Sequence, residues 1–146
     1  MINPGFDPDL SAVVDSALEF ARERGFREAG THQLLLAAIR RSDSAAQQLL
    51  QAMQVDVRPL ARKMESAVFS GVETQPGAGD TVFAPKADRA LAIAVREARG
   101  RRATSAHLVL GIIESRGVGS DALKEAGLTS PKIRNALDGL HGPQAV

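Results

Sequence analysis

Apolar residues between positions 10 and 21 recur with the period of an α-helix. They are Leu10, Val13, Val14, Ala17, Leu18 and Ala21. This stripe predicts an amphipathic helix that buries one face. Asp7 and Pro8 precede the stripe and Gly25 follows it, so we expect Asp7 to be the N-cap and the helix to end before Gly25.

Three more helical patterns follow before Gly71. Thr31 is expected to cap the second helix, Ser42 or Asp43 the third, and Asp56 the fourth. The predicted inward positions are Leu34, Leu35, Ala38 and Ile39 in the second, Ala46, Leu49, Leu50 and Met53 in the third, and Leu60, Ala61, Met64, Ala67 and Val68 in the fourth.

The second half of the chain repeats the first at nearly constant displacement. Phe83-Ala84-Pro85 follows Phe6-Asp7-Pro8 by 77 residues, and the stripe of Leu91, Ala94, Val95 and Ala98 follows that of Val14, Ala17, Leu18 and Ala21 by the same step. Leu108-Val109-Leu110 follows Leu34-Leu35-Leu36 by 74, and Leu123-x-x-Ala126-x-Leu128 follows Leu50-x-x-Met53-x-Val55 by 73. Such regularity indicates an internal repeat. We expect Ser130 to cap the last helix before Pro131, and residues 117–120 to form a turn with positive φ.

The sequence therefore predicts an all-α fold of two tandem four-helix repeats. The repeats span residues 6–71 and 83–141, and a Pro- and Gly-rich linker joins them at 72–82. A unit of ~65 residues buries little surface alone. We expect both repeats to pack about a pseudo-twofold axis as one eight-helix domain covering residues 1–146.

Composition excludes several chemistries. The chain has no Cys, which excludes disulfides and thiol nucleophiles, and it has no G-x-x-x-x-G-K-[ST] motif for ATP. Its three His residues lack zinc-binding spacing, so we expect no metal, cofactor or catalytic residue. The start MINPGFDPDL has no signal-peptide pattern, and no apolar run reaches the ~18 residues of a membrane span. These features predict a cytoplasmic protein that does not enter a membrane.

The repeated order F-x-P…A-x-x-A, T-x-x-L-L-L and L-x-x-M-x-V resembles the Clp N-terminal repeat domain. That domain is the substrate- and adaptor-docking module of ClpA-, ClpB- and ClpC-type AAA+ unfoldases. The resemblance covers roughly Phe6 to Leu140. It implies a non-catalytic module that docks substrate polypeptides or adaptors for a Clp unfoldase and protease, either as a free-standing chain or as an N-domain fragment.

The resemblance also carries expectations about individual residues. The helix-start motif is Gly30-Thr31-His32-Gln33 in the first repeat and Thr104-Ser105-Ala106-His107 in the second. In each repeat of ClpC-like domains, a Thr and a Glu help hold phosphorylated arginine. Here the Thr positions are Asp7 and Ala84, and the Glu positions are His32 and Ala106. No carboxylate replaces the Glu, and Asp7 would repel a phosphate, so phosphoarginine recognition is disfavoured. We expect His107 to steady its helix start, and His32 to lie at an exposed helix N-terminus.

ClpC-like domains further offer a shallow apolar surface around the aromatic residues that open each repeat, and this surface receives peptides and cyclic-peptide ligands. The resemblance therefore implies the binding candidates Phe6, Asp7, His32, Gln33, Phe83, Ala84, Asp88 and Ala106. The alternative is that Phe6 and Phe83 are helix-entry residues packed against the core.

A different functional class remains open. Arg96, Arg99, Arg101 and Arg102 form a basic cluster, through which a helical regulatory protein could bind nucleic acid or an acidic partner. The net charge is only +1, and no aromatic residues for base stacking are interleaved with the arginines. We therefore favour a solvated helix end and expect no nucleic-acid binding.

Overall fold

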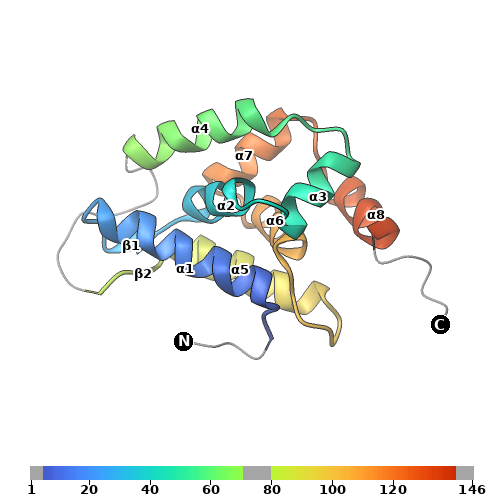
Figure 1. Cartoon of the computed structure of the whole chain (residues 1–146), viewed down its shortest axis with the longest axis horizontal. Coiled ribbons are helices and arrows are strands. Elements are labelled where there is room, and N and C mark those ends of the chain that lie inside the picture. Colours follow the sequence, from blue (N-terminus) through green and yellow to red (C-terminus); the bar gives the residue numbers. More distant parts are fainter. Residues whose placement is uncertain (1–4, 71–79, 141–146) are drawn as a thin grey trace.

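The computed structural model describes residues 5–70 and 80–140. The helices are α1 (Pro8–Glu23), α2 (Thr31–Arg40), α3 (Ala45–Ala52), α4 (Val57–Ser70), α5 (Pro85–Glu97), α6 (Ser105–Ser115), α7 (Val118–Glu125) and α8 (Ser130–Leu140) (Figure 1). Two strands of two residues each, β1 (Glu28–Ala29) and β2 (Val82–Phe83), pair in parallel. The predicted all-α fold is confirmed, and the short strands are an addition that helical periodicity could not show.

Helices α2 and α6 form the centre of the domain. Figure 1 shows them between α1 and α5 on one side and α4 and α7 on the other. Nine of the ten residues of α2 and ten of the eleven residues of α6 are buried, as expected for helices surrounded by protein. Their fully buried side chains include Leu34, Leu35, Leu108, Leu110 and Ile112. The core therefore lies along these two helices.

The helices repeat with the displacements found in the sequence. The first residue of α5 follows that of α1 by 77 positions, α6 follows α2 by 74, and α7 and α8 follow α3 and α4 by 73. The predicted eight-helix repeat is thus confirmed. Residues 72–79 of the expected linker lie outside the described residues, so the division at 72–82 remains a prediction.

The repeats exchange backbone hydrogen bonds at their opening segments. The Asp7 N–H donates to the Ala103 carbonyl at 2.8 Å, and the Ala84 N–H donates to the Ala29 carbonyl at 2.9 Å. These bonds are equivalent under the repeat, because 84 follows 7 by 77 and 103 follows 29 by 74. Each repeat therefore supplies a backbone acceptor to the opening segment of the other.

A second reciprocal pair lies deeper in the domain. The Ala46 N–H in α3 donates to the Ser105 hydroxyl of α6 at 2.8 Å, and the Gly119 N–H in α7 donates to the Thr31 hydroxyl of α2 at 3.2 Å. Both hydroxyls are fully buried. Since an orphaned buried donor costs free energy, these bonds help fix how the repeats pack about the pseudo-twofold axis.

Asp9 breaks this symmetry. Its carboxylate accepts hydrogen bonds from the Ser105 N–H at 2.7 Å and the Ala45 N–H at 3.3 Å, and thus joins the N-termini of α6 and α3. The equivalent position in the second repeat is Lys86. A carboxylate is favourable at a helix N-terminus because it satisfies free N–H groups and complements the helix dipole.

Replacing Asp9 with alanine is expected to lower the free energy of unfolding by about 2 kcal/mol, since each lost helix cap costs about 1 kcal/mol. Urea denaturation followed by circular dichroism at 222 nm measures the change. Asp15→Ala on the exposed face of α1 is the control and should change stability by less than about 0.5 kcal/mol. Equal stability of the two variants would contradict this role for Asp9.

Some predicted helix starts are wrong by one or two residues. Gly30 rather than Thr31 is the N-cap of α2. Ser44, not Ser42 or Asp43, caps α3 by accepting a hydrogen bond from the Gln47 N–H. Thr129, not Ser130, accepts the bond from the Lys132 N–H at the start of α8. Asp7 and Asp56 cap α1 and α4 as predicted, through the Asp9 and Arg58 N–H groups.

Two further predictions are wrong. Residues 117–120 are not a turn with positive φ, because Gly117 is the N-cap of α7 at φ −98° and residues 118–120 are helical. A Cβ on Gly119 would lie 2.7 Å from Ile112 Cγ2 and 3.3 Å from the backbone carbonyl oxygen of Thr31, so close packing requires this glycine. Val95 is exposed rather than inward, whereas Ile93 is buried on the same helix.

Candidate functional site

The reciprocal packing sorts the sequence-predicted binding residues into two groups. Phe6 and Asp7 lie beside the segment that leads to Ala106, since Phe6 forms a bridge with Ala103. Phe83 and Ala84 lie beside the segment that leads to His32 and Gln33, because Phe83 pairs with Ala29 in the sheet. Each group thus combines the opening of one repeat with the second helix of the other.

Half of these candidates are buried. His32 and Gln33 are completely buried, and Ala84 and Ala106 are nearly so. The expectation that His32 is exposed is therefore wrong: α2 is a central helix, and α7 covers its first turn through the bond between Gly119 and Thr31. As predicted, His107 supports the start of α6, because its Nδ1 accepts the Thr104 N–H at 3.1 Å.

The remaining candidates reach the surface to different degrees. Phe6 and Phe83 are half-buried and pack against the core, and Asp7 is half-buried as the cap of α1. Asp88 is exposed in the first turn of α5, and partial desolvation of its carboxyl raises the pKa of Asp88 above its usual range. A ligand-binding role for the eight candidates remains a prediction.

The basic cluster is partly neutralised. Arg96 lies 3.6 Å from Glu114 and 3.5 Å from Glu97, and Arg134 of α8 contacts the same two carboxylates. These exposed ion pairs contribute little to stability, but they reduce the local positive charge. The geometry therefore does not favour nucleic-acid binding through this end of α5.

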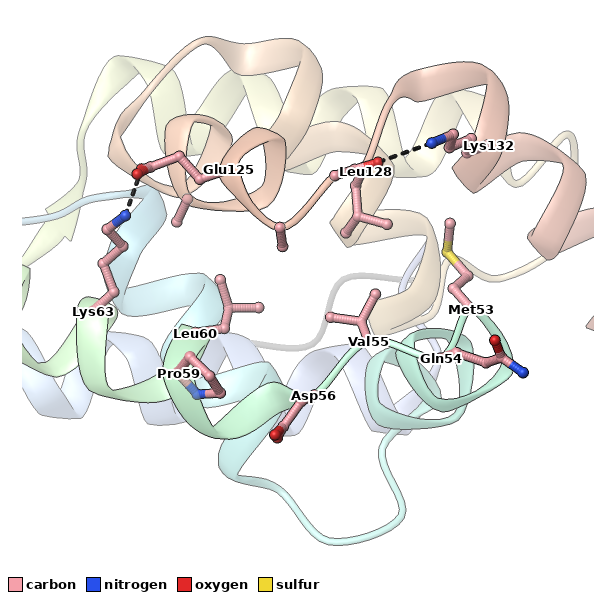
Figure 2. A pocket seen from close by; sticks show the side chains of 13 residues that line it. Met53, Gln54, Val55, Asp56, Pro59, Leu60, Lys63, Glu125, Leu128 and Lys132 are labelled. Carbon is pink, nitrogen blue, oxygen red and sulfur yellow. Dashed lines mark hydrogen bonds and ion pairs between the residues drawn. The ribbon is translucent and has the colours of Figure 1, made fainter.

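A groove lies where the third and fourth helices of the two repeats meet. One wall is formed by the corner between α3 and α4, residues 53–60, and the other by α7 and the start of α8, residues 122–132 (Figure 2). Its volume is about 620 Å³. Met53, Val55 and Pro59 are related by the 73-residue displacement to Ala126, Leu128 and Lys132. The groove thus crosses the pseudo-twofold axis.

The groove combines apolar surface with charged edges. Leu60, Ala122 and Leu128 are buried at its base, whereas the side chains of Met53 and Val55 are only half-buried. Figure 2 shows an ion pair between Lys63 of α4 and Glu125 of α7 across one end. At the other end Lys132 Nζ donates to the Gly127 carbonyl at 3.2 Å.

Sequence analysis singled out six of these residues for other reasons: Asp56 as a helix cap, Leu60 as an inward position, and the other four as landmarks of the repeat. Met53, Val55, Ala126 and Leu128 mark equivalent positions in the two repeats, and Met53 was expected to face the core. A pattern within one repeat does not show that two such corners face each other. The predicted pseudo-twofold axis could have indicated the groove, because such an axis brings the equivalent helix connections of the two repeats together.

Comparison with known proteins decides the family. The sequence profile of the Clp repeat N-terminal domain matches residues 5–126. The chain belongs to the Clp repeat N-terminal domain family. It is 32% identical over 129 residues to the ClpA homolog of Trieres chinensis, an ATP-dependent Clp protease ATP-binding subunit, and 30% identical to the chloroplastic chaperone protein ClpC1 of Arabidopsis thaliana. Both alignments cover 86% of the chain but only 14% of the relative.

Solved Clp-type N-terminal domains share the fold. The Hsp104 N-terminal domain of Candida albicans matches with a TM-score of 0.76 and 18% identity, over 95% of this chain and 93% of that chain. The ClpD N-terminal domain of Arabidopsis thaliana matches with a TM-score of 0.67 and 19% identity, over 97% and 98%. The Clp repeat domain described here therefore has the architecture of these N-terminal domains.

Within residues 5–70 and 80–140, no helix of this Clp repeat domain combines the length and apolar character needed to span a bilayer. The same residues contain no group of three or more His, Asp or Glu side chains placed to hold a metal ion.

Proposed function

We propose that this Clp repeat domain is a non-catalytic protein-binding module that docks substrate polypeptides or adaptor proteins for a Clp-type AAA+ unfoldase, in the cytoplasm. Family membership supports the class of partner. The groove at the junction of the repeats is the observation that carries the proposal, since it provides apolar contact area outside the packed core.

The shape and chemistry of the groove suit an unfolded polypeptide segment. Apolar side chains in a concave surface with a polar rim are typical of binding sites, because a ligand gains by removing them from water. Met53 and Val55 contact the core yet keep part of their surface exposed. A segment with aliphatic side chains could cover that surface without rearranging the buried residues.

Filling the groove should weaken binding of an unfolded protein. Ala126 is exposed and lines the groove, so Ala126→Gln places a larger neutral side chain there. We expect the Kd for fluorescein-labelled casein, measured by fluorescence anisotropy, to rise about fivefold, equivalent to a loss of about 1 kcal/mol. The matched control is Ala52→Gln, because Ala52 is exposed at the end of α3 and does not line the groove.

A degradation assay connects binding with the Clp system. The purified domain is added in excess to a Clp unfoldase and protease that degrades an unfolded client. Faster degradation indicates delivery of the client, and slower degradation indicates competition for it. An unchanged rate, together with no client or adaptor retained by the immobilised domain, would contradict the proposed function.

A further inference from the structure

Lys132 lies at one end of the groove, where it makes no ion pair with any residue that the structure describes. Among the charged lining residues, Lys63 pairs with Glu125 and Asp56 pairs with Arg58. Within the described part of the chain, Lys132 makes no ion pair, and its Nζ donates one hydrogen bond, to the Gly127 carbonyl. An ammonium group has three donors, so capacity for an acceptor from a ligand remains.

The N-terminus of α8 adds partial positive charge beside Lys132. Lys132 lies in the first turn of the helix, where the dipole is positive and a cation is unfavourable. An anion bound beside Lys132 would interact favourably with both the ammonium group and the helix terminus. The electrostatics at this end of the groove therefore favour a negatively charged ligand group.

Apolar surface adjoins the cation. Leu128 and Val55 face each other across the groove beside Lys132 and Met53 (Figure 2). A ligand that satisfies both features carries aliphatic side chains next to a carboxylate. In a polypeptide this combination occurs where leucine, isoleucine or valine adjoins aspartate or glutamate.

We propose that the groove selects polypeptide segments in which aliphatic residues adjoin an acidic side chain, with the carboxylate paired to Lys132. This inference rests on the proposed docking function and names its preferred ligand class. The Lys63–Glu125 pair at the opposite end leaves no comparable excess charge there, so the carboxylate is expected at the Lys132 end.

Two peptides that differ in one charge test this preference. The probes are fluorescein-labelled GSLLEGS and GSLLQGS with blocked termini, which leaves the glutamate as the only carboxylate. We expect the glutamate peptide to bind about threefold more tightly at low salt, as suits an exposed ion pair, and the difference to shrink in 0.5 M NaCl. Lys132→Ala should abolish the difference.

Lys124→Ala is the matched control, because Lys124 is exposed on α7, lies outside the groove and changes the net charge equally. This variant should keep the threefold preference. Equal affinity of the two peptides for the unmodified domain, or a preference that survives Lys132→Ala, would overturn the inference while leaving the docking function intact. Failure of both peptides and of casein to bind would instead contradict the docking function.

Discussion

Alanine in place of Gly111 is expected to lower the free energy of unfolding by about 3 kcal/mol, as severe overpacking does. Gly111 lies on the face of α6 that packs against α5, and a Cβ at this position would overlap the Ala90 carbonyl oxygen. Backbone cannot move aside as a flexible side chain can. The loss should exceed the gain of about 1 kcal/mol that alanine brings to a helix interior.

Gly139→Ala provides the control for this experiment. Gly139 is also helical, but a Cβ there meets no atom within 4 Å. This substitution should leave stability unchanged or raise it by up to about 1 kcal/mol. Chemical denaturation of both variants gives the two values, and a Gly111→Ala variant as stable as Gly139→Ala would show that α5 and α6 do not approach so closely.

The double substitution Phe6→Ala and Phe83→Ala should lower the free energy of unfolding by about 4 kcal/mol. Truncating a fully buried Phe to alanine lowers the free energy of unfolding by about 3–5 kcal/mol. Phe6 and Phe83 are only half-buried, so each truncation is expected to cost about half of that. The result would assign both residues mainly to the core. A melting temperature unchanged by the double substitution, combined with loss of peptide binding, would instead assign them to a binding surface.

Phe6→Leu with Phe83→Leu separates the two roles, because leucine keeps most of the apolar volume and removes the aromatic rings. This variant should melt close to the unmodified protein and bind casein with the same Kd, since neither residue lines the groove. Weaker binding by the folded leucine variant would show that the aromatic rings contact ligands.

Helix bodies could be predicted from this sequence because apolar spacing and repetition agree. The matching displacements of 77, 74 and 73 made weak local signals reinforce one another. Helix starts were less certain where several capping residues stand together. Ser42, Asp43 and Ser44 can each accept a hydrogen bond from a helix N–H, and only the packed structure selects Ser44.

Burial of the first helical turns could not be predicted, because it depends on contacts between repeats. His32 begins a helix, and such positions are commonly exposed in an isolated helix. Here the opposite repeat supplies α7 to cover it, at a separation of more than eighty residues in the chain. Contacts between repeats also explain why position 119 requires glycine, since the neighbouring sequence does not show that Ile112 and Thr31 pack closely there.

The groove was missed for a related reason. Met53 follows Leu49 and Leu50 at helical spacing, and apolar residues in such a pattern usually belong to a core. The partial exposure of Met53 and Val55 arises because the two corners stand apart where the repeats meet. Sequence periodicity reports which side chains turn inward, but it does not report how completely a neighbouring element fills the space above them.

The reciprocal bonds between Asp7 and Ala103 and between Ala84 and Ala29 have a consequence for unfolding. Each repeat supplies a backbone partner to the opening segment of the other, and each also satisfies a buried hydroxyl in the other. Loss of either half exposes unpaired groups in the half that remains. The domain should therefore unfold in one cooperative transition, and a single repeat expressed alone should have no stable tertiary structure.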